Sequence, residues 1–210
     1  MSIILIGMPS CGKSTLGVLL AKKLGLEFID SDLLIQKKHG KLLHELIAEQ
    51  GNDAFLTLEA EVNCGIEATD AVIATGGSAV YSEAAMAHLG TLGKIVYIHI
   101  SYEEMEARLG DYAHRGVIMP DGFTLRDLYE QRRALYERYA DVTVSGEGGM
   151  PAAIERITQA LYRKSTCDPR VTSALFLVFK LAVIQCCVQP VLRKQCVVRT
   201  ALDDVTVLHD

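Results

Sequence analysis

Runs of apolar residues divide the chain at fairly regular intervals. Residues 3–6, 71–75 and 94–100 are rich in β-branched and aliphatic side chains and do not alternate with polar ones, as in strands that are buried on both faces. Residues 26–29 and 142–144 form two shorter runs. Together these runs predict five strands.

Between the runs, apolar residues recur at helical spacing, and Gly25, Gly40 and Gly51 stand where helices are expected to end. Thr124 with Asp127 has the spacing of a helix cap, whereas residues 111–123 have no apolar period and predict a loop. Strands that alternate with helices predict an α/β fold, a parallel sheet with helices on both faces. The predicted helices cover residues 16–24, 33–39, 42–50, 54–68, 101–109, 124–139 and 152–163.

The stretch between the first strand and the first helix fits the phosphate-binding pattern G-x-x-x-x-G-K-[ST]-T. Gly7 and Gly12 permit backbone conformations that are closed to residues with a Cβ, so that the N–H groups of the loop point at an anion. Lys13 is expected to reach the β- and γ-phosphates of a nucleoside triphosphate, and Ser14 to hold Mg²⁺. The residues expected at the nucleotide are Gly7, Ser10, Cys11, Gly12, Lys13, Ser14 and Thr15.

Polar residues also follow the second and third strands, at the edge where α/β sheets bind ligands. Asp30 and Asp32 come after the second strand, and the alternative for them is a helix N-cap followed by a favourable charge in the first helical turn; Asp32 could serve both purposes. Gly76 and Gly77 follow the third strand and allow a ligand to approach the backbone. That strand ends in Thr75 rather than in an acid, so Asp30 is the nearest carboxylate to serve the metal.

Composition narrows the class of partner. The chain has 210 residues and a formal net charge of −5, which leaves no basic field to hold a nucleic acid. None of its six cysteines has C-x-x-C spacing, so neither a zinc site nor a redox pair is indicated. We expect no signal peptide, a reducing cytoplasmic compartment and a monomer.

The composition changes after Lys164, and we therefore expect a P-loop domain over residues 1–164 and a separate tail over residues 165–210. Residues 171–192 are apolar and about long enough to span a bilayer, but Lys180 near their centre makes a membrane anchor unfavourable. A poorly ordered appendage, an interaction helix, a weak anchor and an extension without a selected function are the alternatives. We favour the first and the last.

The order and spacing of these motifs resemble the shikimate kinase family. The phosphate loop is followed by Phe-Ile-Asp-Ser-Asp at residues 28–32, by Ala-Thr-Gly-Gly-Ser at residues 74–78 and by Arg-Arg-Ala-Leu-Tyr at residues 132–136. The resemblance covers about residues 2–163. It implies a P-loop NTPase fold of the nucleoside-monophosphate-kinase type, with a five-stranded parallel sheet. It also implies Mg²⁺-dependent transfer of the γ-phosphoryl group of ATP to the 3-hydroxyl of shikimate, in aromatic amino acid biosynthesis.

On the nucleotide side, the resemblance assigns the phosphates to Lys13 and the metal to Ser14 and, through water, to Asp30. It places Arg108 against the adenine, and it makes Arg115 the arginine that closes over the phosphates during catalysis.

On the acceptor side, the resemblance assigns the substrate hydroxyls and the transferred proton to Asp32, the lining of the site to Gly76 and Gly77, and the substrate carboxylate to Arg132. A plain surface ion pair with Glu130 or Glu137 is the alternative for Arg132.

Some positions depart from the family pattern. Leu56 stands where the family has a second arginine for the carboxylate, Ser78 where it has a third glycine, and Gly116 where it has proline. Glu59 is retained without an evident partner. A kinase for another small hydroxylated metabolite, such as gluconate or homoserine, therefore stays open. So do a nucleoside monophosphate kinase and a non-catalytic nucleotide-binding regulator.

Overall fold

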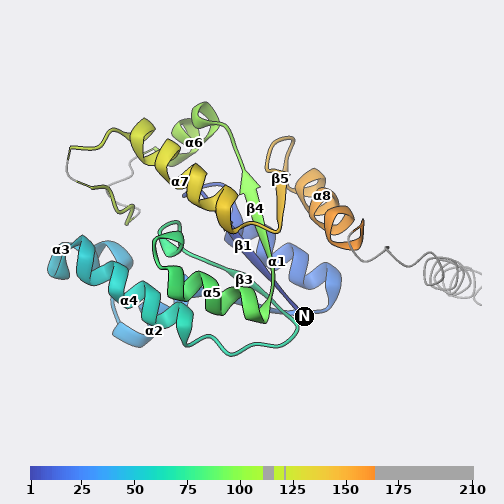
Figure 1. Ribbon diagram of the computed structural model, residues 1–210, viewed down its shortest axis with the longest axis horizontal. Helices are drawn as coiled ribbons and strands as arrows, with labels where there is room; N and C mark the ends of the chain where they lie inside the picture. Colours follow the sequence, from blue (N-terminus) through green and yellow to red (C-terminus); the bar gives the residue numbers. More distant parts are fainter. Residues whose placement is uncertain (111–115, 121, 164–210) are drawn as a thin grey trace, which may run out of the picture. The chain divides into compact units, whose positions relative to one another are not determined.

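The computed structural model describes residues 1–110, 116–120 and 122–163, and within them the chain builds one parallel sheet (Figure 1). The five strands stand in the order β2-β3-β1-β4-β5, and each neighbouring pair is parallel. Their bounds are β1 Ser2–Gly7, β2 Glu27–Asp30, β3 Ala71–Ala74, β4 Gly93–His99 and β5 Val142–Ser145. The predicted fold class and all five predicted strands are confirmed, each strand within two residues at either end.

Helices occupy the connections between the strands, and most of them lie where the apolar period predicted them. The longest, α7, starts after Thr124, whose side chain accepts from the Asp127 N–H while Asp127 bonds back, as the cap spacing predicted. The helices of the described residues are α1 Lys13–Leu24, α2 Ser31–His39, α3 Leu43–Gln50, α4 Asn52–Cys64, η1 Ala79–Tyr81, α5 Glu83–Leu92, α6 Tyr102–Leu109, α7 Leu125–Tyr139 and α8 Met150–Arg163.

The helices form a layer on each side of the sheet (Figure 1). On one side lie α5 and α7, and on the other side lies α1, where Gly17 admits the ring of Phe28 from β2. A Cβ at Gly17 would come within 2.5 Å of that ring, so the small residue sets how closely α1 approaches the sheet.

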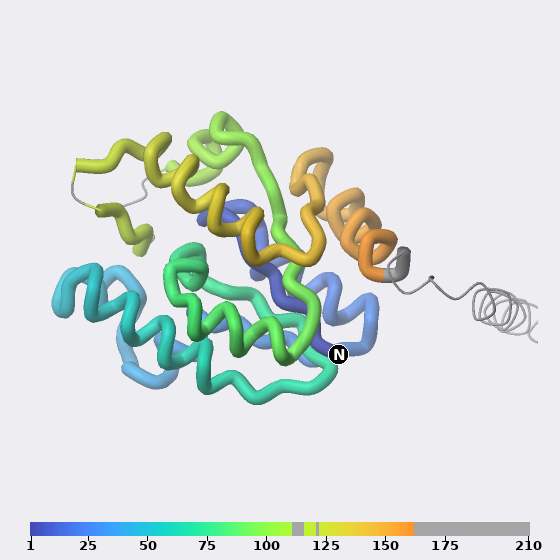
Figure 2. Tube along the Cα trace, viewed as in Figure 1, coloured from blue at the N-terminus to red at the C-terminus, as the bar shows by residue number. Residues whose placement is uncertain are grey.

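Two apolar clusters hold these layers together. The larger cluster surrounds the sheet and includes Ile4, Leu5 and Ile6 of β1, all fully buried. The smaller one joins α2, α3 and α4 through Ile35, Leu46, Phe55, Leu58 and Ile118. Ile118 belongs to the segment 116–120, which Figure 2 shows between α7 and α3, so this cluster fixes a loop as well as three helices.

Strand β1 is central. The chain adds β2 and β3 on one side of β1 and then adds β4 and β5 on the other side. The connection from β1 runs to β2 at one edge, and the connection from β3 crosses to β4 on the other side of β1. In open α/β sheets such a reversal opens a crevice at the carboxyl ends of the strands, where ligands bind. The phosphate loop follows β1 directly and therefore stands at this crevice.

Among the residues described, no helix combines the length and the apolar character needed to cross a bilayer. Arg115 and the predicted tail over residues 165–210 lie outside the described residues. The helices and strands from Met1 to Leu161 form one compact unit. The boundary at residue 164, the compartment and the monomeric state stay predictions.

Candidate active site

The phosphate loop has a backbone that depends on glycine. Gly7 has φ 151°, and a Cβ there would lie 2.7 Å from the Ile98 carbonyl oxygen of β4. Gly12, which precedes α1, has φ 96°. Both values lie where residues with a Cβ are strained, so the sequence pattern corresponds to a real geometric requirement.

Lys13 is folded into this loop. Its ammonium group donates to the carbonyl oxygens of Gly7 and Met8 at 2.8 and 2.9 Å, and the side chain is 8% exposed. Because the loop N–H groups and the start of α1 form an electropositive cradle, the buried ammonium adds a full charge to a site already suited to phosphate.

Asp30 and Asp32 have different positions in the structure: one caps a helix and the other lines the cavity. Asp30 is the cap of α2, and its Oδ1 accepts from the backbone N–H groups of Asp32 and Leu33 at 3.0 and 3.3 Å. The side chain of Asp32 faces the cavity beside the phosphate loop. Burial raises the pKa of the Asp32 carboxyl to about 6, the charge of Asp30 adds to the rise, and Lys13 opposes it.

Glu59 on α4 is a further carboxylate of the site, which sequence reasoning noted without a role. It is 1% exposed, and its Oε2 has no hydrogen-bond partner among the described residues. Burial raises the pKa of the Glu59 carboxyl to about 7. A hydrogen bond with Ser78 opposes the rise, Asp32 adds to it, and Arg132 and Lys13 oppose it. The signal available in the sequence was its spacing from Phe55, which puts both on the buried face of α4.

Arg132 of α7 is buried, with 1% of its surface exposed. Its Nη2 donates to the Ile118 carbonyl at 2.8 Å, and its Nε donates to the Tyr81 hydroxyl at 3.2 Å. The alternative of a surface ion pair is wrong for Arg132, since it is the next residue, Arg133, that pairs with Glu130 and Glu137.

The loop after β3 is held from both sides of the crevice. The Gly76 N–H donates to the Ser31 hydroxyl at 3.0 Å, and the Gly77 carbonyl accepts from the Tyr136 hydroxyl at 2.5 Å. A Cβ at Gly76 would collide with the Glu59 carboxylate and lie 2.8 Å from Asp32 Oδ1. Gly76 therefore lets the two carboxylates lie against the backbone, whereas a Cβ at Gly77 would lie 3.1 Å from Pro9 and 3.2 Å from Arg132 Nη1.

These groups line one cavity of about 420 Å³. Most of the predicted site residues line it, namely Ser10, Gly12, Lys13, Ser14, Thr15, Asp32, Gly76, Gly77 and Arg132. The other lining residues were not among the predicted site residues, and they are Pro9, Leu43, Phe55, Glu59, Thr75, Ser78, Gly116, Val117 and Ile118. Gly7, Cys11 and Asp30 stand behind this surface rather than on it. Arg108 is on α6 and pairs with Glu104 one turn away, and Arg115 lies outside the described residues.

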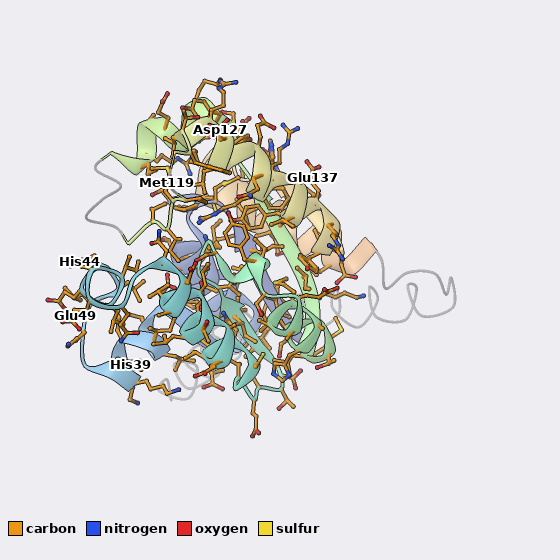
Figure 3. All side chains as sticks on the ribbon, turned by 60° about the vertical axis from the view of Figure 1, so that its left-hand side comes forward. His39, His44, Glu49, Met119, Asp127 and Glu137 are labelled. Atoms are coloured by element: carbon orange, nitrogen blue, oxygen red, sulfur yellow. The ribbon has the colours of Figure 1, made fainter. Side chains whose placement is uncertain are left out.

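The segment 116–120 closes one side of the cavity. A Cβ at Gly116 would lie 3.1 Å from the Leu43 Cβ of α3, and the Met119 carbonyl accepts from the Asn52 side chain at 3.1 Å. Figure 3 labels Met119 between α7, marked by Asp127, and α3, marked by His44. This segment thus joins the two sides of the crevice.

Comparison with known proteins identifies the family of this chain. The family model described as shikimate kinase matches residues 9–162. A shikimate kinase of Clostridium botulinum is 34% identical over 161 residues, which are 76% of this chain and 96% of that protein. The chain belongs to the shikimate kinase family. A shikimate kinase of Francisella tularensis subsp. novicida is 37% identical over 151 residues, 70% of this chain and 86% of its own.

Solved structures of shikimate kinases share the fold. The crystal structure of the enzyme from Aquifex aeolicus superposes with a TM-score of 0.71 at 31% identity, over 80% of this chain and 100% of that one. The enzyme from Acinetobacter baumannii in complex with shikimate gives a TM-score of 0.70 at 29% identity, over 80% of this chain and 95% of that one.

Within this shikimate kinase fold, Leu56 lies on α4 three residues before Glu59 and does not line the main cavity. Among the described residues, Arg132 is the arginine that lines this cavity.

Proposed function

We propose that this chain transfers the γ-phosphoryl group of ATP to the 3-hydroxyl of shikimate, with Mg²⁺. The observation that carries the proposal is a single cavity in which Lys13 and Ser14 of the phosphate loop face Asp32 and Arg132. One half suits a triphosphate and the other suits a small hydroxylated acid. Membership of the shikimate kinase family and the shikimate bound to the Acinetobacter baumannii relative support this choice of acceptor.

The residues present fit a nucleotide with its metal. Gly7 and Gly12 give the loop the positive-φ backbone that a phosphate cradle uses, and Lys13 supplies the charge. Among the described residues no cluster of three or more acidic, histidine or cysteine side chains surrounds a metal. Mg²⁺ keeps several waters and is held by one or two protein groups and the phosphates. Ser14 and, through water, Asp30 would hold it.

When bound, Mg²⁺ neutralises charge on the phosphates. Lys13 would bind the β- and γ-phosphates, and Arg115 would add a second cation. Arg108 would lie against the adenine. Phosphoryl transfer depends mainly on positioning and on charge neutralisation, so these cations contribute more than any covalent step.

On the acceptor side, Arg132 would bind the substrate carboxylate. Two of its N–H groups already fix the guanidinium plane, which leaves Nη1 for the ligand. Asp32 would accept the proton of the attacking hydroxyl, and its raised pKa brings it closer to the operating pH of a general base. Gly76 and Gly77 would lie against the ring.

The test is ADP release with ATP and Mg²⁺ over a panel that holds shikimate, gluconate, homoserine, AMP and CMP. We expect turnover with shikimate to exceed turnover with every other member by at least about a hundredfold. A preference for gluconate or homoserine would redirect the proposal to another small-molecule kinase. ATP binding without turnover on any acceptor would favour a regulator and would contradict the proposal.

A further inference from the structure

Tyr81 makes two contacts with Arg132, the arginine proposed to bind the substrate carboxylate. Tyr81 is the last residue of η1, the short helix that follows the glycine turn after β3. Its hydroxyl accepts from the Nε of Arg132 at 3.2 Å, and its ring centre lies 5.2 Å from the guanidinium carbon. Tyr81 itself does not line the main cavity. Any effect that it has on a ligand in this cavity therefore passes through Arg132.

Gln131 fixes the direction of the hydrogen bonds at the Tyr81 hydroxyl. A phenol hydroxyl has a single hydrogen, and Tyr81 donates it to the Oε1 of Gln131 at 2.7 Å. A lone pair of the same oxygen is then left to accept from Arg132, whose Nε–H can only donate. Two successive residues of α7, the exposed Gln131 and the buried Arg132, are thus joined through one tyrosine.

The contacts of Arg132 leave one of its terminal nitrogens at the cavity wall. Its Nε is bonded to Tyr81, and its Nη2 donates to the Ile118 carbonyl at 2.8 Å. Its Nη1 lies beside Gly77, where a Cβ would come within 3.2 Å of it. Because an arginine side chain has many rotamers, holding it in one of them before a ligand arrives removes an entropic cost from binding.

The orientation of this one side chain decides how a carboxylate is held. Among the residues that the structure describes, Arg132 is the arginine of the main cavity, and a carboxylate is bound best by a guanidinium group in a fixed plane. We propose that Tyr81 is a positioning residue for the acceptor: its hydroxyl and its ring hold Arg132 in the orientation that binds the substrate carboxylate. The inference rests on the proposed function.

A second tyrosine of the chain provides a matched control. The guanidinium carbon of Arg126 lies 4.3 Å from the centre of the Tyr102 ring, and the Tyr102 hydroxyl donates to Glu106 at 2.8 Å. Neither Tyr102 nor Arg126 lines the main cavity. Tyr102→Phe therefore removes a hydroxyl from a tyrosine that also carries an arginine, without a change at the acceptor site.

The first experiment measures the Michaelis constants of Tyr81→Phe. This variant keeps the ring but removes the acceptor for the Nε of Arg132, so KM for shikimate should rise about fivefold to tenfold. KM for ATP and kcat should change by less than about twofold, because the lost interaction serves only to bind the acceptor. Tyr102→Phe should change none of these constants. An unchanged KM for shikimate in Tyr81→Phe, or an equal rise in both Michaelis constants, overturns the inference.

Gln131→Leu tests the same contact from the exposed side of α7. The variant keeps the tyrosine but frees its hydroxyl hydrogen to turn toward Arg132, so KM for shikimate should rise about twofold to threefold. KM for ATP should stay constant. Because Gln131 is exposed, this variant keeps the test open if Tyr81→Phe does not fold. Gln159→Leu, an exposed change on α8, should have no effect. Equal constants for Gln131→Leu and the wild-type protein contradict the inference.

A measurement without turnover separates failure of the inference from failure of the proposed function. The Nε–H resonance of Arg132, identified by its absence from Arg132→Lys, should exchange with water at least about tenfold faster in Tyr81→Phe than in the wild-type protein. Tyr102→Phe should leave this rate unchanged. Equal rates in Tyr81→Phe and wild type overturn the inference. Faster exchange in Tyr81→Phe, with no turnover of shikimate by the wild type, contradicts the proposed acceptor and still supports Tyr81 as the residue that orients Arg132.

Discussion

Lys13, Glu59 and Arg132 are charged side chains with less than a tenth of their surface exposed, and all three line the same cavity. Burying a charge is expensive unless it is paired or neutralised. Arg132 and Lys13 are stabilised by backbone carbonyls, whereas Glu59 keeps one unpaired oxygen. The region therefore favours binding and catalysis over stability, which is typical of an active site.

Asp32 gives the first prediction at this scale. In the proposed mechanism the ionised carboxylate of Asp32 accepts the hydroxyl proton, and burial raises the pKa of this carboxyl to about 6. We therefore expect kcat/KM for shikimate to fall about tenfold per pH unit well below pH 6. A pH series from 4.5 to 8 measures this. Asp32→Asn should lose most of the activity and the acid limb with it. An acid limb that persists in the variant would assign the titration to another group.

Lys13 gives the second prediction at the scale of single residues. Lys13→Ala removes the ammonium group that would bind the β- and γ-phosphates, so turnover should be abolished. Lys22→Ala, on the exposed part of the same helix, is the matched control and should keep wild-type rates. Circular dichroism of both variants checks that the fold is retained. Full activity of a folded Lys13→Ala protein would remove Lys13 from the mechanism.

At single positions the sequence was most informative where chemistry and backbone geometry coincide. The phosphate-loop glycines have the positive φ angles that their pattern requires. The sequence alone does not show that Arg132 is buried while Arg133 forms surface ion pairs. In a helix with charged residues on every side, the buried side is known only once the packing partner of α7 is known. The same limit applies to Glu59, whose burial depends on the loop after β3 and on α7.

At the scale of elements, α7 connects the parts of the site. Its inward side carries Arg132, which reaches Ile118, and one turn later Tyr136, which reaches Gly77. The outer side carries exposed residues, among them Asp127 and Glu137 (Figure 3). The helix thus fixes two loops that have no regular structure of their own.

Tyr136→Phe tests this element. The variant keeps the buried ring, which stacks on Tyr97 at 5.1 Å between centroids, but leaves the Gly77 carbonyl without its donor. An unpaired buried carbonyl costs about 1–3 kcal/mol, so the loop is expected to shift.

The readout for Tyr136→Phe is the Michaelis constant of each substrate. KM for shikimate should rise about tenfold while KM for ATP changes by less than about twofold. Tyr139→Phe on the same helix is the control. Equal changes in both constants would indicate a general loss of packing instead.

Sequence patterns predicted nearly every element but missed α5, Glu83–Leu92. Its residues are small, and Gly90 interrupts them, so the apolar period is weak. Ser82, which caps the helix by accepting from the Ala85 N–H, was the available signal. The helix predicted over residues 54–68 is also shorter in the structure, since α4 ends at Cys64 before Gly65.

At the scale of the whole molecule, the two buried carboxyls make stability depend on pH. Their ordinary pKa values of 3.8 and 4.5 rise to about 6 for Asp32 and about 7 for Glu59 on folding. The folded chain therefore binds more protons than the unfolded chain between about pH 4 and pH 7. The free energy of unfolding consequently falls as the pH rises through this window, by a few kcal/mol at most.

The double variant Asp32→Asn, Glu59→Gln removes this dependence. Its melting temperature should exceed that of the wild-type protein by several degrees at pH 8 and should show no gain at pH 4. Glu67→Gln, an exposed change on the same unit, should leave the melting curve unchanged at both pH values. A gain at pH 4 as large as at pH 8 would point to packing rather than to proton binding.

Removal of residues 165–210 is the prediction for domain organisation. As far as the structure describes the chain, the residues of the sheet, of both apolar clusters and of the cavity lie within residues 1–161. The shortened protein should therefore keep kcat/KM for shikimate within about twofold of the full chain. Loss of the cooperative melting transition would place the domain boundary further along the chain.

The bond from Arg132 to the Ile118 carbonyl has a thermodynamic consequence. One guanidinium group holds the segment 116–120 and also lines the cavity. In the proposed complex, an acid that binds Arg132 would therefore also act on Gly116 and Val117, which line the same cavity. By linkage, whatever factor shikimate imposes on the dissociation constant of ATP, ATP must impose on that of shikimate. Two calorimetric titrations of opposite order would therefore close a thermodynamic cycle through a single arginine.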